Sequence, residues 1–360
     1  MNPAQTPLVC LTPRLSGVGG MVSFQQKLAA GLQNRGIEVC YDPADTRARA
    51  LLVVGGTRHL RPLLQARRRG IPVIQRLDGM NWIHRVQARR GSGRLDVRHY
   101  LRAEYGNLIL ALIRRRIASR IVYQSEFSRR WWERVHGPTP VEHTVIYNGV
   151  NLDDFTPQGT ETPPDDRCRL LLVEGSLMGG YELGLETAVQ LARRLEALLA
   201  KGDQAAMPVE LLVAGRVSEA LQKSWDERLV RAGAPFTLHW AGVVPHEKIP
   251  ALDRSAHLLY SADVNAACPN SVVEALACGL PVVAFDTGAL PEMVAGDAGR
   301  IAAYGGDPWR LDPPDVDALV HAALEILENQ PRFRAAARQR AEEAFDLETM
   351  VARYAEVLLG

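Results

Sequence analysis

The residues best suited to chemistry lie in one segment of the second half of the chain, residues 258–294. An apolar run there ends in a polar turn, Pro269-Asn270-Ser271, and a short helical pattern follows that Gly279 closes. A second apolar run leads into another polar turn, Asp286–Pro291. The first backbone amides of a helix lack partners within the helix, and the helix dipole adds positive potential at that end. This segment therefore predicts a site for an anion such as a diphosphate.

Glu274 lies one turn into this predicted helix, and two interpretations of it are open. In the first, Ser271 and Glu274 form a capping box, in which the Glu side chain bonds back to the Ser amide. In the second, the carboxylate accepts hydrogen bonds from two neighbouring ribose hydroxyls. A strand, a phosphate-binding turn, an acid and a helix in this order are what a nucleotide-sugar site requires.

Apolar runs alternate with amphipathic stretches along the whole chain, which predicts strands alternating with helices. In the first half the expected strands are Leu8–Thr12, Ile37–Tyr41, Ala50–Val54, Val73–Arg76, Arg120–Gln124 and His143–Ile146, with a helix over Met21–Asn34. In the second half they are Leu170–Glu174, Val209–Ala214, Phe236–Trp240, Leu258–Ser261 and Pro281–Phe285. The helices expected between them include Tyr181–Leu199, Glu219–Arg231, Ser271–Ala277 and Asp315–Glu328.

This alternation predicts an α/β protein with parallel sheets covered by helices on both faces. The segment Thr156–Asp166 contains three prolines and no apolar periodicity, so it is expected to be a linker. We therefore expect a first Rossmann-like domain over 1–156, a linker over 157–166 and a second such domain over 167–330. The two doubly wound domains are expected to face each other across a ligand-binding cleft. The last stretch, 331–360, is expected to be helical and is a candidate to pack back on the first domain.

Charge is distributed unevenly along the chain. Residues 1–150 carry 24 Lys and Arg against 9 Asp and Glu, whereas the other 210 residues carry 18 against 32. Within 85–120 there are ten arginines and only two acids, Asp96 and Glu104. Two interpretations of this charge are equally open. The arginines lie on solvated helix faces, or they form a patch that contacts an anionic membrane surface or a phosphorylated acceptor. A nucleic-acid partner is not expected, because no recognition motif accompanies the charge.

The cysteines and the apolar runs bear on the compartment. Five cysteines form no CxxC pair and no Cys/His cluster, which favours reduced thiols over disulfides or zinc. No signal sequence precedes the first strand, and no apolar run approaches the ~20 residues that a membrane span needs. We expect a cytoplasmic protein, with peripheral contact at the inner face of a membrane as an open possibility.

Several motifs resemble one known family. The segment Glu274–Val283 (EALACGLPVV), with the residues that follow it, resembles the donor-site signature of glycosyltransferase family 4, a group of retaining GT-B enzymes that use nucleotide-diphosphate sugars. The following residues are Asp286, Gly288, Pro291 and Glu292. Four further segments are similar to the family in the same order: Gly17–Gly20 (GVGG), Tyr123–Ser128 (YQSEFS), Ile146–Asn151 (IYNGVN) and Trp240–Pro245 (WAGVVP). The resemblance extends over nearly the whole chain.

The resemblance implies roles for these residues. It gives Glu274 the ribose hydroxyls, and the nucleobase contacts fall to Val244 and Pro245. The amides of Asn270, Ser271 and Val272 would bind the donor phosphates or sugar. Gly19 and Gly20 would approach the diphosphate, since a side chain there would hold the backbone away. The alternative for these glycines is a tight strand-to-helix turn without a ligand.

The sequence departs from the family at three positions. The family usually has a second Glu eight residues before Glu274, and this chain has Ala266. It also usually has an Arg and a Lys after the first strand of the second domain, where this chain has Ser176 and no Lys through Tyr181. Loss of two cations beside a diphosphate weakens charge stabilisation unless others replace them. Candidates for replacement are Arg216 and Arg14, either of which could equally be a surface residue.

Asp78 is the candidate catalytic residue. It follows the strand that ends near Arg76, at a place where family members often have a His or Asp close to the transferred sugar. An Asx-turn or a helix cap is an equally open role for it, and so is an ion pair with Arg76. His84 is interpreted as a surface helix residue.

The resemblance implies transfer of a hexose-type sugar from a nucleotide-diphosphate donor to an unidentified acceptor, with retention. No DxD motif follows a strand, so neither a metal nor another cofactor is expected to be required. Two rivals remain open: another GT-B enzyme such as a nucleotide-sugar epimerase, and a binding paralogue that has lost catalysis, which Ala266 and Ser176 make credible.

Overall fold

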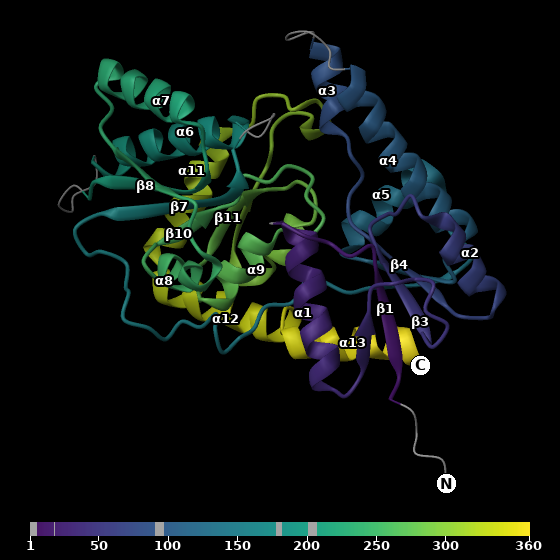
Figure 1. Cartoon of the computed structure of the whole chain (residues 1–360). Coiled ribbons are helices and arrows are strands. Elements are labelled where there is room, and N and C mark those ends of the chain that lie inside the picture. Colours follow the sequence, from purple (N-terminus) through teal and green to yellow (C-terminus); the bar gives the residue numbers. More distant parts are fainter. Residues whose placement is uncertain (1–5, 18, 91–96, 178–181, 201–206) are drawn as a thin grey trace. The chain divides into compact units, whose positions relative to one another are not determined.

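Two compact units make up the chain (Figure 1). The computed structural model describes residues 6–17, 19–90, 97–177, 182–200 and 207–360. Unit 1 consists of Met1–Gly149 and Asp346–Gly360, and unit 2 consists of Val150–Phe345. Each unit is built around one parallel sheet of six strands.

The sheet of unit 1 has the strand order β2-β1-β3-β4-β5-β6, and every neighbouring pair is parallel. Its strands are β1 (Leu8–Thr12), β2 (Glu38–Cys40), β3 (Ala50–Val54), β4 (Val73–Leu77), β5 (Arg120–Tyr123) and β6 (Glu142–Val145). Because β1 pairs with both β2 and β3, the winding direction reverses at β1. The segment that follows β1 thus lies at a switch point, where ligands of such sheets bind.

Helices cover both faces of this sheet, because successive strand residues point to opposite sides. They are α1 (Gly20–Asn34), α2 (Leu60–Arg68), α3 (Ile83–Arg90), α4 (Val97–Arg116), α5 (Glu126–His136) and α13 (Leu347–Leu359). Val9 and Leu11 pack with α1 and α13 in one apolar cluster. Cys10 packs with α2 and α4 in another.

The sheet of unit 2 has the order β12-β11-β10-β7-β8-β9 and is also parallel throughout. Its strands are β7 (Cys168–Ser176), β8 (Val209–Arg216), β9 (Thr237–Gly242), β10 (Leu258–Tyr260), β11 (Val282–Phe285) and β12 (Gly299–Ala302). The chain passes outward from β7 to β9 and then returns to place β10 on the other side of β7. The switch point of this sheet therefore lies between β7 and β10.

The helices of unit 2 again lie on both faces. They are α6 (Glu182–Leu199), α7 (Glu219–Ala232), α8 (Ile249–Arg254), α9 (Asn270–Ala277), α10 (Leu290–Met293), α11 (Val316–Glu328) and α12 (Gln330–Ala344). The apolar faces of α6 and α11 pack on alternate residues of β7 and β8 to form the main core.

The predicted α/β architecture with two doubly wound parallel sheets is confirmed. Three details differ from the sequence-based expectations. β12 was not predicted, because it has only four residues and begins with Gly299. Along the chain, unit 1 ends at Gly149 and unit 2 begins at Val150, whereas the expected end of the first domain was residue 156. The C-terminal stretch is two helices, α12 in unit 2 and α13 in unit 1, because the Asp346 side chain caps α13 and starts a new helix.

Candidate functional site

Unit 2 brings most of the predicted donor-site residues to the carboxyl ends of its strands. Ser176 ends β7 and Arg216 ends β8, and the two are paired across the sheet. The turn before α9 follows β10, the other strand at the switch point. The described part of the loop after β7 stops at Leu177, so positions 178–181, where no Lys is found, lie outside the described residues.

α9 begins at Asn270, after Pro269 in the extended N-cap position. Because α9 begins at Asn270, its first amides are those of Asn270, Ser271 and Val272. Asn270 and Ser271 are half-buried, and Val272 is fully buried. The capping-box interpretation of Ser271 and Glu274 is wrong, since Ser271 lies inside the helix instead of at its N-cap. The proline before α9 fixes the chain direction and leaves the terminal amides without a side-chain cap from that position.

The Glu274 carboxylate is buried, with 6% of the residue exposed. Its Oε1 lies 2.9 Å from Nε2 of His246, whose side chain is 54% exposed. The His246 ring also packs on Phe155, with 5.2 Å between centroids. Sequence reasoning missed His246, although it directly follows Pro245 in the predicted base-binding segment.

A second acid lies beside Glu274. Asp253 on α8 is 1% exposed, and its Oδ2 has no hydrogen-bond partner among the described residues. Burial, and next the negative charge of Glu274, raise the pKa of Asp253 well above its usual range. The Cys278 thiol is hydrogen-bonded to this carboxyl. The neutral form of Asp253 is therefore favoured.

Arg216, a candidate for the replacement cation, lies at the end of β8. Its side chain is exposed and makes no ion pair with any described residue. The amide of Leu177 donates to the Arg216 carbonyl at 3.0 Å, which holds the ends of β7 and β8 together. Arg14 of unit 1 is also exposed, and its guanidinium lies 5.1 Å from the centre of the Tyr41 ring.

Two acids that sequence reasoning missed lie at the same strand ends. Glu174 is near the end of β7 and Asp263 follows β10. Burial raises the pKa of Asp263 to about 6. Burial and the charge of Asp263 raise the pKa of Glu174 well above its usual range. Protonated carboxyls repel a diphosphate less than ionised ones, so this pair is compatible with an anion when at least one proton is held.

Ala266, where the family has a Glu, is in close contact with the turn that contains Gly288 and Ala289. Gly288 has φ +60°, and a Cβ there would lie 2.6 Å from both the amide nitrogen and the carbonyl oxygen of Ala266. The amide of Ala289 donates to the Ala266 carbonyl at 2.9 Å. Gly288 is therefore required by this close approach. Val244 and Pro245 follow β9, half-buried and exposed respectively.

In unit 1 the glycine loop follows β1 at its switch point. Gly19 is the N-cap of α1 with φ +146°, and Gly20 is the first helical residue. Gly17 also has a positive φ, and nothing lies within 4 Å of a Cβ placed on Gly17 or Gly19. Val18 lies outside the described residues. Backbone conformation requires both glycines, and the space beside them is open.

Asp78 directly follows β4 and is half-buried. Burial raises its pKa, although the nearby positive charge of Arg76 and a bond from its own amide oppose this. Its carbonyl accepts a 2.7 Å hydrogen bond from Nε1 of Trp132. Asp78 is not a helix cap, because α3 begins only at Ile83.

Two expectations near Asp78 are wrong. Arg76 makes no ion pair with Asp78; it is 1% exposed, donates to Asn148 at 2.7 Å and lies 3.7 Å from the centre of the Phe24 ring. His84 is buried instead of lying at the surface, and its Nε2 lies 2.9 Å from a Glu104 carboxylate oxygen.

Among the described residues, no group of three or more His, Cys, Asp or Glu side chains is placed to hold a metal ion. All five cysteines are free thiols. None of the described helices has both the length and the apolar character that crossing a membrane requires.

Comparison with known proteins places this geometry in a class. Residues 177–329 match the family model described as glycosyl transferases group 1. The lipopolysaccharide core biosynthesis mannosyltransferase LpsB of Rhizobium meliloti (strain 1021) is 30% identical over 128 residues, which are 35% of this chain and 34% of that protein. The O-antigen chain mannosyltransferase B of Escherichia coli is 34% identical over 92 residues, 26% of this chain and 22% of that protein. The alignments thus span about a third or less of these relatives.

Solved structures extend the similarity to the whole fold. The sucrose-phosphate synthase (tll1590) from Thermosynechococcus elongatus superposes with a TM-score of 0.69 at 15% identity, over 98% of each chain. Anabaena Alr3699/HepE, solved in complex with UDP-glucose, superposes with a TM-score of 0.63 at 15% identity, over 98% of this chain and 99% of that one.

The chain thus has the fold of the GT-B glycosyltransferase structures, and its residues 177–329 are similar to the group 1 glycosyl transferases. The match of this part of the chain supports the glycosyltransferase resemblance seen in its motifs.

Proposed function

We propose that this protein transfers a hexose from a nucleotide-diphosphate sugar to an acceptor. The observation that carries the proposal is the position of buried Glu274 behind the first amides of α9, at the switch point of the unit 2 sheet. Glu274 accepts hydrogen bonds from the ribose hydroxyls, and the amides of Asn270, Ser271 and Val272 bind the phosphates or the sugar.

The remaining residues complete the proposed donor site. Arg216 supplies positive charge beside Ser176, and Val244 and Pro245 contact the base. For unit 1, the motif resemblance assigns the diphosphate contact to Gly19 and Gly20 and the contact with the transferred sugar to Asp78. These assignments rest on the motif resemblance together with the positions of the residues after their strands.

A donor panel tests the proposal. Mannose and glucose linked to guanosine or uridine diphosphate are incubated with the protein, and both transfer and slow donor hydrolysis are measured. We expect one donor to be turned over. If no nucleotide diphosphate binds at all, the donor-site assignment is wrong.

We propose mannose as the sugar and a lipopolysaccharide-type glycan as the acceptor. Support comes from the two relatives, which are named as mannosyltransferases of lipopolysaccharide core and O-antigen. The neighbour solved with UDP-glucose keeps glucose and uridine in the panel. Competition between the donors at equal concentration decides between the sugars.

We further propose retention of the anomeric configuration, without a metal. The leaving diphosphate is stabilised by amides and by arginine, and the acceptor attacks from the same face. Proton NMR of the first product reports its anomeric configuration, and activity after chelation reports the metal requirement. A product with inverted anomeric configuration contradicts retention. Complete loss of activity with the chelator contradicts the independence from a metal.

A binding paralogue without catalysis is the second candidate, favoured by Ala266 and by the acids Glu174 and Asp263 beside the proposed phosphate site. It predicts nucleotide-diphosphate binding with neither transfer nor hydrolysis of any donor.

We propose that unit 1 contacts an anionic membrane through α4. Five apolar residues with helical spacing are exposed along this helix, and we call them the α4 stripe: Val97, Leu101, Tyr105, Leu108 and Leu112, 39–62% exposed. Arg98 and Arg102 lie beside the stripe and are also exposed. Of the other charges in this segment, Arg94 and Asp96 lie outside the described residues.

An apolar helix face flanked by arginines is suited to the surface of an anionic bilayer. Vesicle co-sedimentation at increasing salt measures this contact. No binding at low salt contradicts it.

A further inference from the structure

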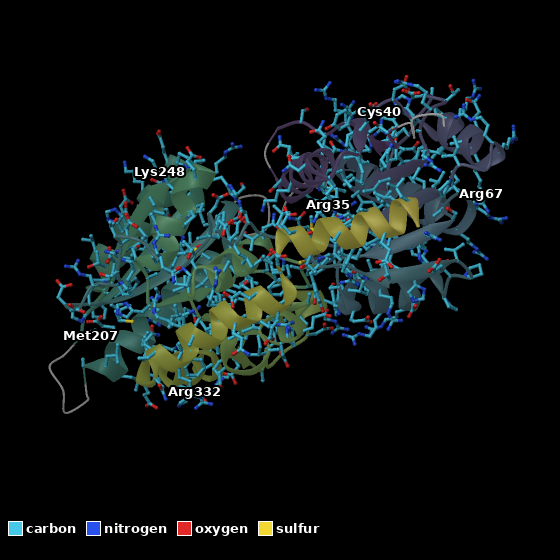
Figure 2. The ribbon with its side chains drawn as sticks, turned by 90° about the horizontal axis from the view of Figure 1, so that it is seen from below. Arg35, Cys40, Arg67, Met207, Lys248 and Arg332 are labelled. Carbon is cyan, nitrogen blue, oxygen red and sulfur yellow. The ribbon has the colours of Figure 1, made fainter. Side chains whose placement is uncertain are left out.

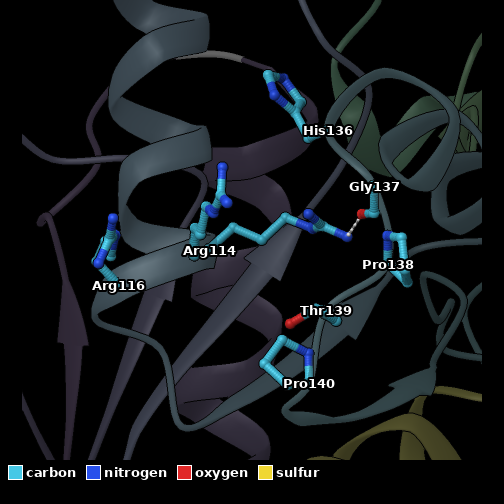
Figure 3. Close-up of a pocket in the computed structure, with 8 residues that line it drawn as sticks. Arg114, Arg116, His136, Gly137, Pro138, Thr139 and Pro140 are labelled. Carbon is cyan, nitrogen blue, oxygen red and sulfur yellow. Dashed lines mark hydrogen bonds between the residues drawn. The ribbon is translucent and has the colours of Figure 1, made fainter.

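A basic cavity of about 470 Å³ lies in unit 1, between the end of α4 and the loop after α5 (Figure 3). Its lining is Arg114, Arg115, Arg116, His136, Gly137, Pro138, Thr139 and Pro140. No lining residue is acidic. Three arginines therefore border one cavity without a carboxylate among its lining residues, so the cavity is suited to an anion.

Arg114 is the fixed part of this cavity. It is only 2% exposed, and its Nε donates to the Tyr123 hydroxyl at 3.0 Å. Its Nη2 donates to the Gly137 carbonyl at 2.8 Å, the contact drawn in Figure 3. No described acid forms an ion pair with it. Neutral acceptors thus orient a buried guanidinium that makes no ion pair with a described acid.

Arg115 and Arg116 are exposed and form no ion pair with a described residue. Basic residues at a helix C-terminus often serve to bind its last carbonyls. Here Arg67 does so, since its Nη1 donates to the carbonyls of Arg116 and Ile117 at 2.6 and 2.9 Å. Arg67 lies at the surface of unit 1 in Figure 2. The capping role is therefore filled without Arg115 and Arg116.

His136 also lies among the residues that line the cavity. Its ring stacks on that of Trp132, with 5.3 Å between the centroids. Partial burial, and next the positive charges of Arg114 and Arg85, lower its pKa. The nearby acids are engaged elsewhere, Glu133 with Arg129 at 2.7 Å and Glu104 with Arg85.

The cavity is separate from the residues assigned to sugar transfer. Arg116 and Pro140 precede β5 and β6, whereas the glycine loop and Asp78 follow β1 and β4. In a parallel sheet, strand starts and strand ends lie at opposite edges. The cavity therefore belongs to the edge of unit 1 away from its proposed donor contacts.

We propose that this cavity binds a phosphate group of a larger ligand. Guanidinium groups match phosphate oxygens in geometry and charge, and a cavity of about 470 Å³ has room for the group that carries the phosphate. The phosphate belongs either to a soluble phosphate ester or to an anionic lipid headgroup. The lipid is included because the α4 stripe ends at Leu112, two residues before Arg114.

The test uses the full chain with the double variant Arg115→Gln/Arg116→Gln. Both side chains are exposed, so the fold does not depend on them. The matched control is Arg68→Gln/Arg69→Gln, an adjacent exposed pair at the end of α2 that removes the same charge but does not line the cavity. Calorimetric titration with inorganic phosphate is made on all three proteins. The amides of α9 offer a second phosphate site, which is unchanged in both variants.

We expect phosphate affinity at the cavity to fall by about tenfold or more in the Arg115/Arg116 variant and to stay unchanged in the control. The proposal is overturned if phosphate affinity falls equally in both variants. It is also overturned if wild type and the Arg115/Arg116 variant show no difference in saturable phosphate binding. Nucleotide binding by unit 2 is measured on the same proteins and is expected to be unaffected, so the donor proposal stands or falls separately.

Vesicles identify the source of the phosphate. Phosphatidylcholine vesicles are compared with and without phosphatidylglycerol. A loss of phosphatidylglycerol binding in the Arg115/Arg116 variant beyond that of the control indicates a lipid headgroup. Equal vesicle binding by the two variants, with the phosphate difference retained, indicates a soluble phosphate ester.

Discussion

At the scale of single residues, the proposed donor site contains a hydrogen-bonded pair, Glu274 and His246. Glu274 is buried beside Asp253, whose raised pKa reflects burial and the Glu274 charge. The start of α9 at Asn270 excludes the capping-box role for this carboxylate. In the proposed donor site, its contact with His246 engages the oxygen Oε1, for which a ribose hydroxyl would compete.

We expect Glu274→Gln to weaken nucleotide-diphosphate binding by about tenfold or more, because the hydroxyls lose a charged acceptor. Its melting temperature should stay close to that of the wild type, since removing the charge also relieves Asp253. Calorimetry and thermal unfolding measure the two effects. The control is Glu247→Gln, a nearby exposed acid. A large loss of stability with intact affinity contradicts the ribose-binding role.

His246→Ala tests the other partner. The hydrogen bond to Glu274 must break or be shared when a ribose binds, so its removal should strengthen nucleotide binding by about threefold to tenfold. Titration with the nucleoside diphosphate found in the donor panel measures the change. Weaker binding means instead that His246 holds Glu274 in its binding position.

At the scale of elements, turns between strands and helices determine where the site residues lie. Gly288 and Gly296 both have φ near +60°, but only Gly288 has backbone within reach of a Cβ. Their alanine variants therefore separate the cost of backbone conformation from the cost of a clash.

Gly296→Ala should lower the free energy of unfolding by about 1 kcal/mol, the cost of the left-handed conformation. Gly288→Ala should lower it by more than about 2 kcal/mol, because the methyl group also displaces Ala266. It should also weaken nucleotide binding, since Ala266 belongs to the loop before α9. Denaturant unfolding measures the free energy of unfolding of both variants. An equal loss in the two variants contradicts the close approach of Gly288 to Ala266.

The start of β7 is joined to β10 by His257. Its amide donates to the Arg169 carbonyl at 2.9 Å, and its Nδ1 accepts from the Arg169 amide at 3.0 Å. Burial, and then the charges of Arg334 and Arg169, lower the pKa of His257 from 6.5 to about 4. The neutral ring is therefore favoured in the folded state. Its contribution to stability is complete above pH 6.5 and is lost as the pH falls toward 4.

His257→Asn keeps an acceptor at a similar position but does not titrate in this range. We expect its melting temperature to match the wild type at pH 8 and to fall less steeply from about pH 6.5 to about pH 4. Parallel pH profiles of the two proteins contradict the assignment.

At the scale of the whole molecule, the chain crosses between its units twice. Unit 1 is completed only by α13, which contributes Met350, Val351, Tyr354 and Leu358 to its core. Unit 2 is one continuous segment with a core of its own, formed by α6, α11 and the sheet.

Deletion of residues 346–360 should therefore destabilise unit 1 selectively. We expect unit 1 to lose cooperative unfolding, because the exposed apolar faces of α1 and β1 have lost their cover. Unit 2 should retain its unfolding transition and its nucleotide binding. Calorimetry of the truncated chain, with the segment 150–345 alone as control, measures this. Loss of both transitions contradicts the division of the core.

Local patterns in the sequence determined the alternation of strands and helices, and with it the parallel sheets and the turn before α9. Apolar periodicity and glycine positions are local properties of the chain, so 258–294 was sufficient to predict a strand, a turn and a helix there. They did not reveal β12, whose four residues carry little signal, or the helix break that the Asp346 cap creates.

Tertiary structure decided which side chains meet. His246 is 28 residues from Glu274 in the sequence, and Asp253 and Glu274 lie on different helices. Arg76 contacts Asn148 and Phe24 instead of Asp78, because the burial of its charge depends on partners from other strands and helices. Residue types and spacing thus predicted a donor site, whereas the charge and accessibility of its groups depend on long-range packing.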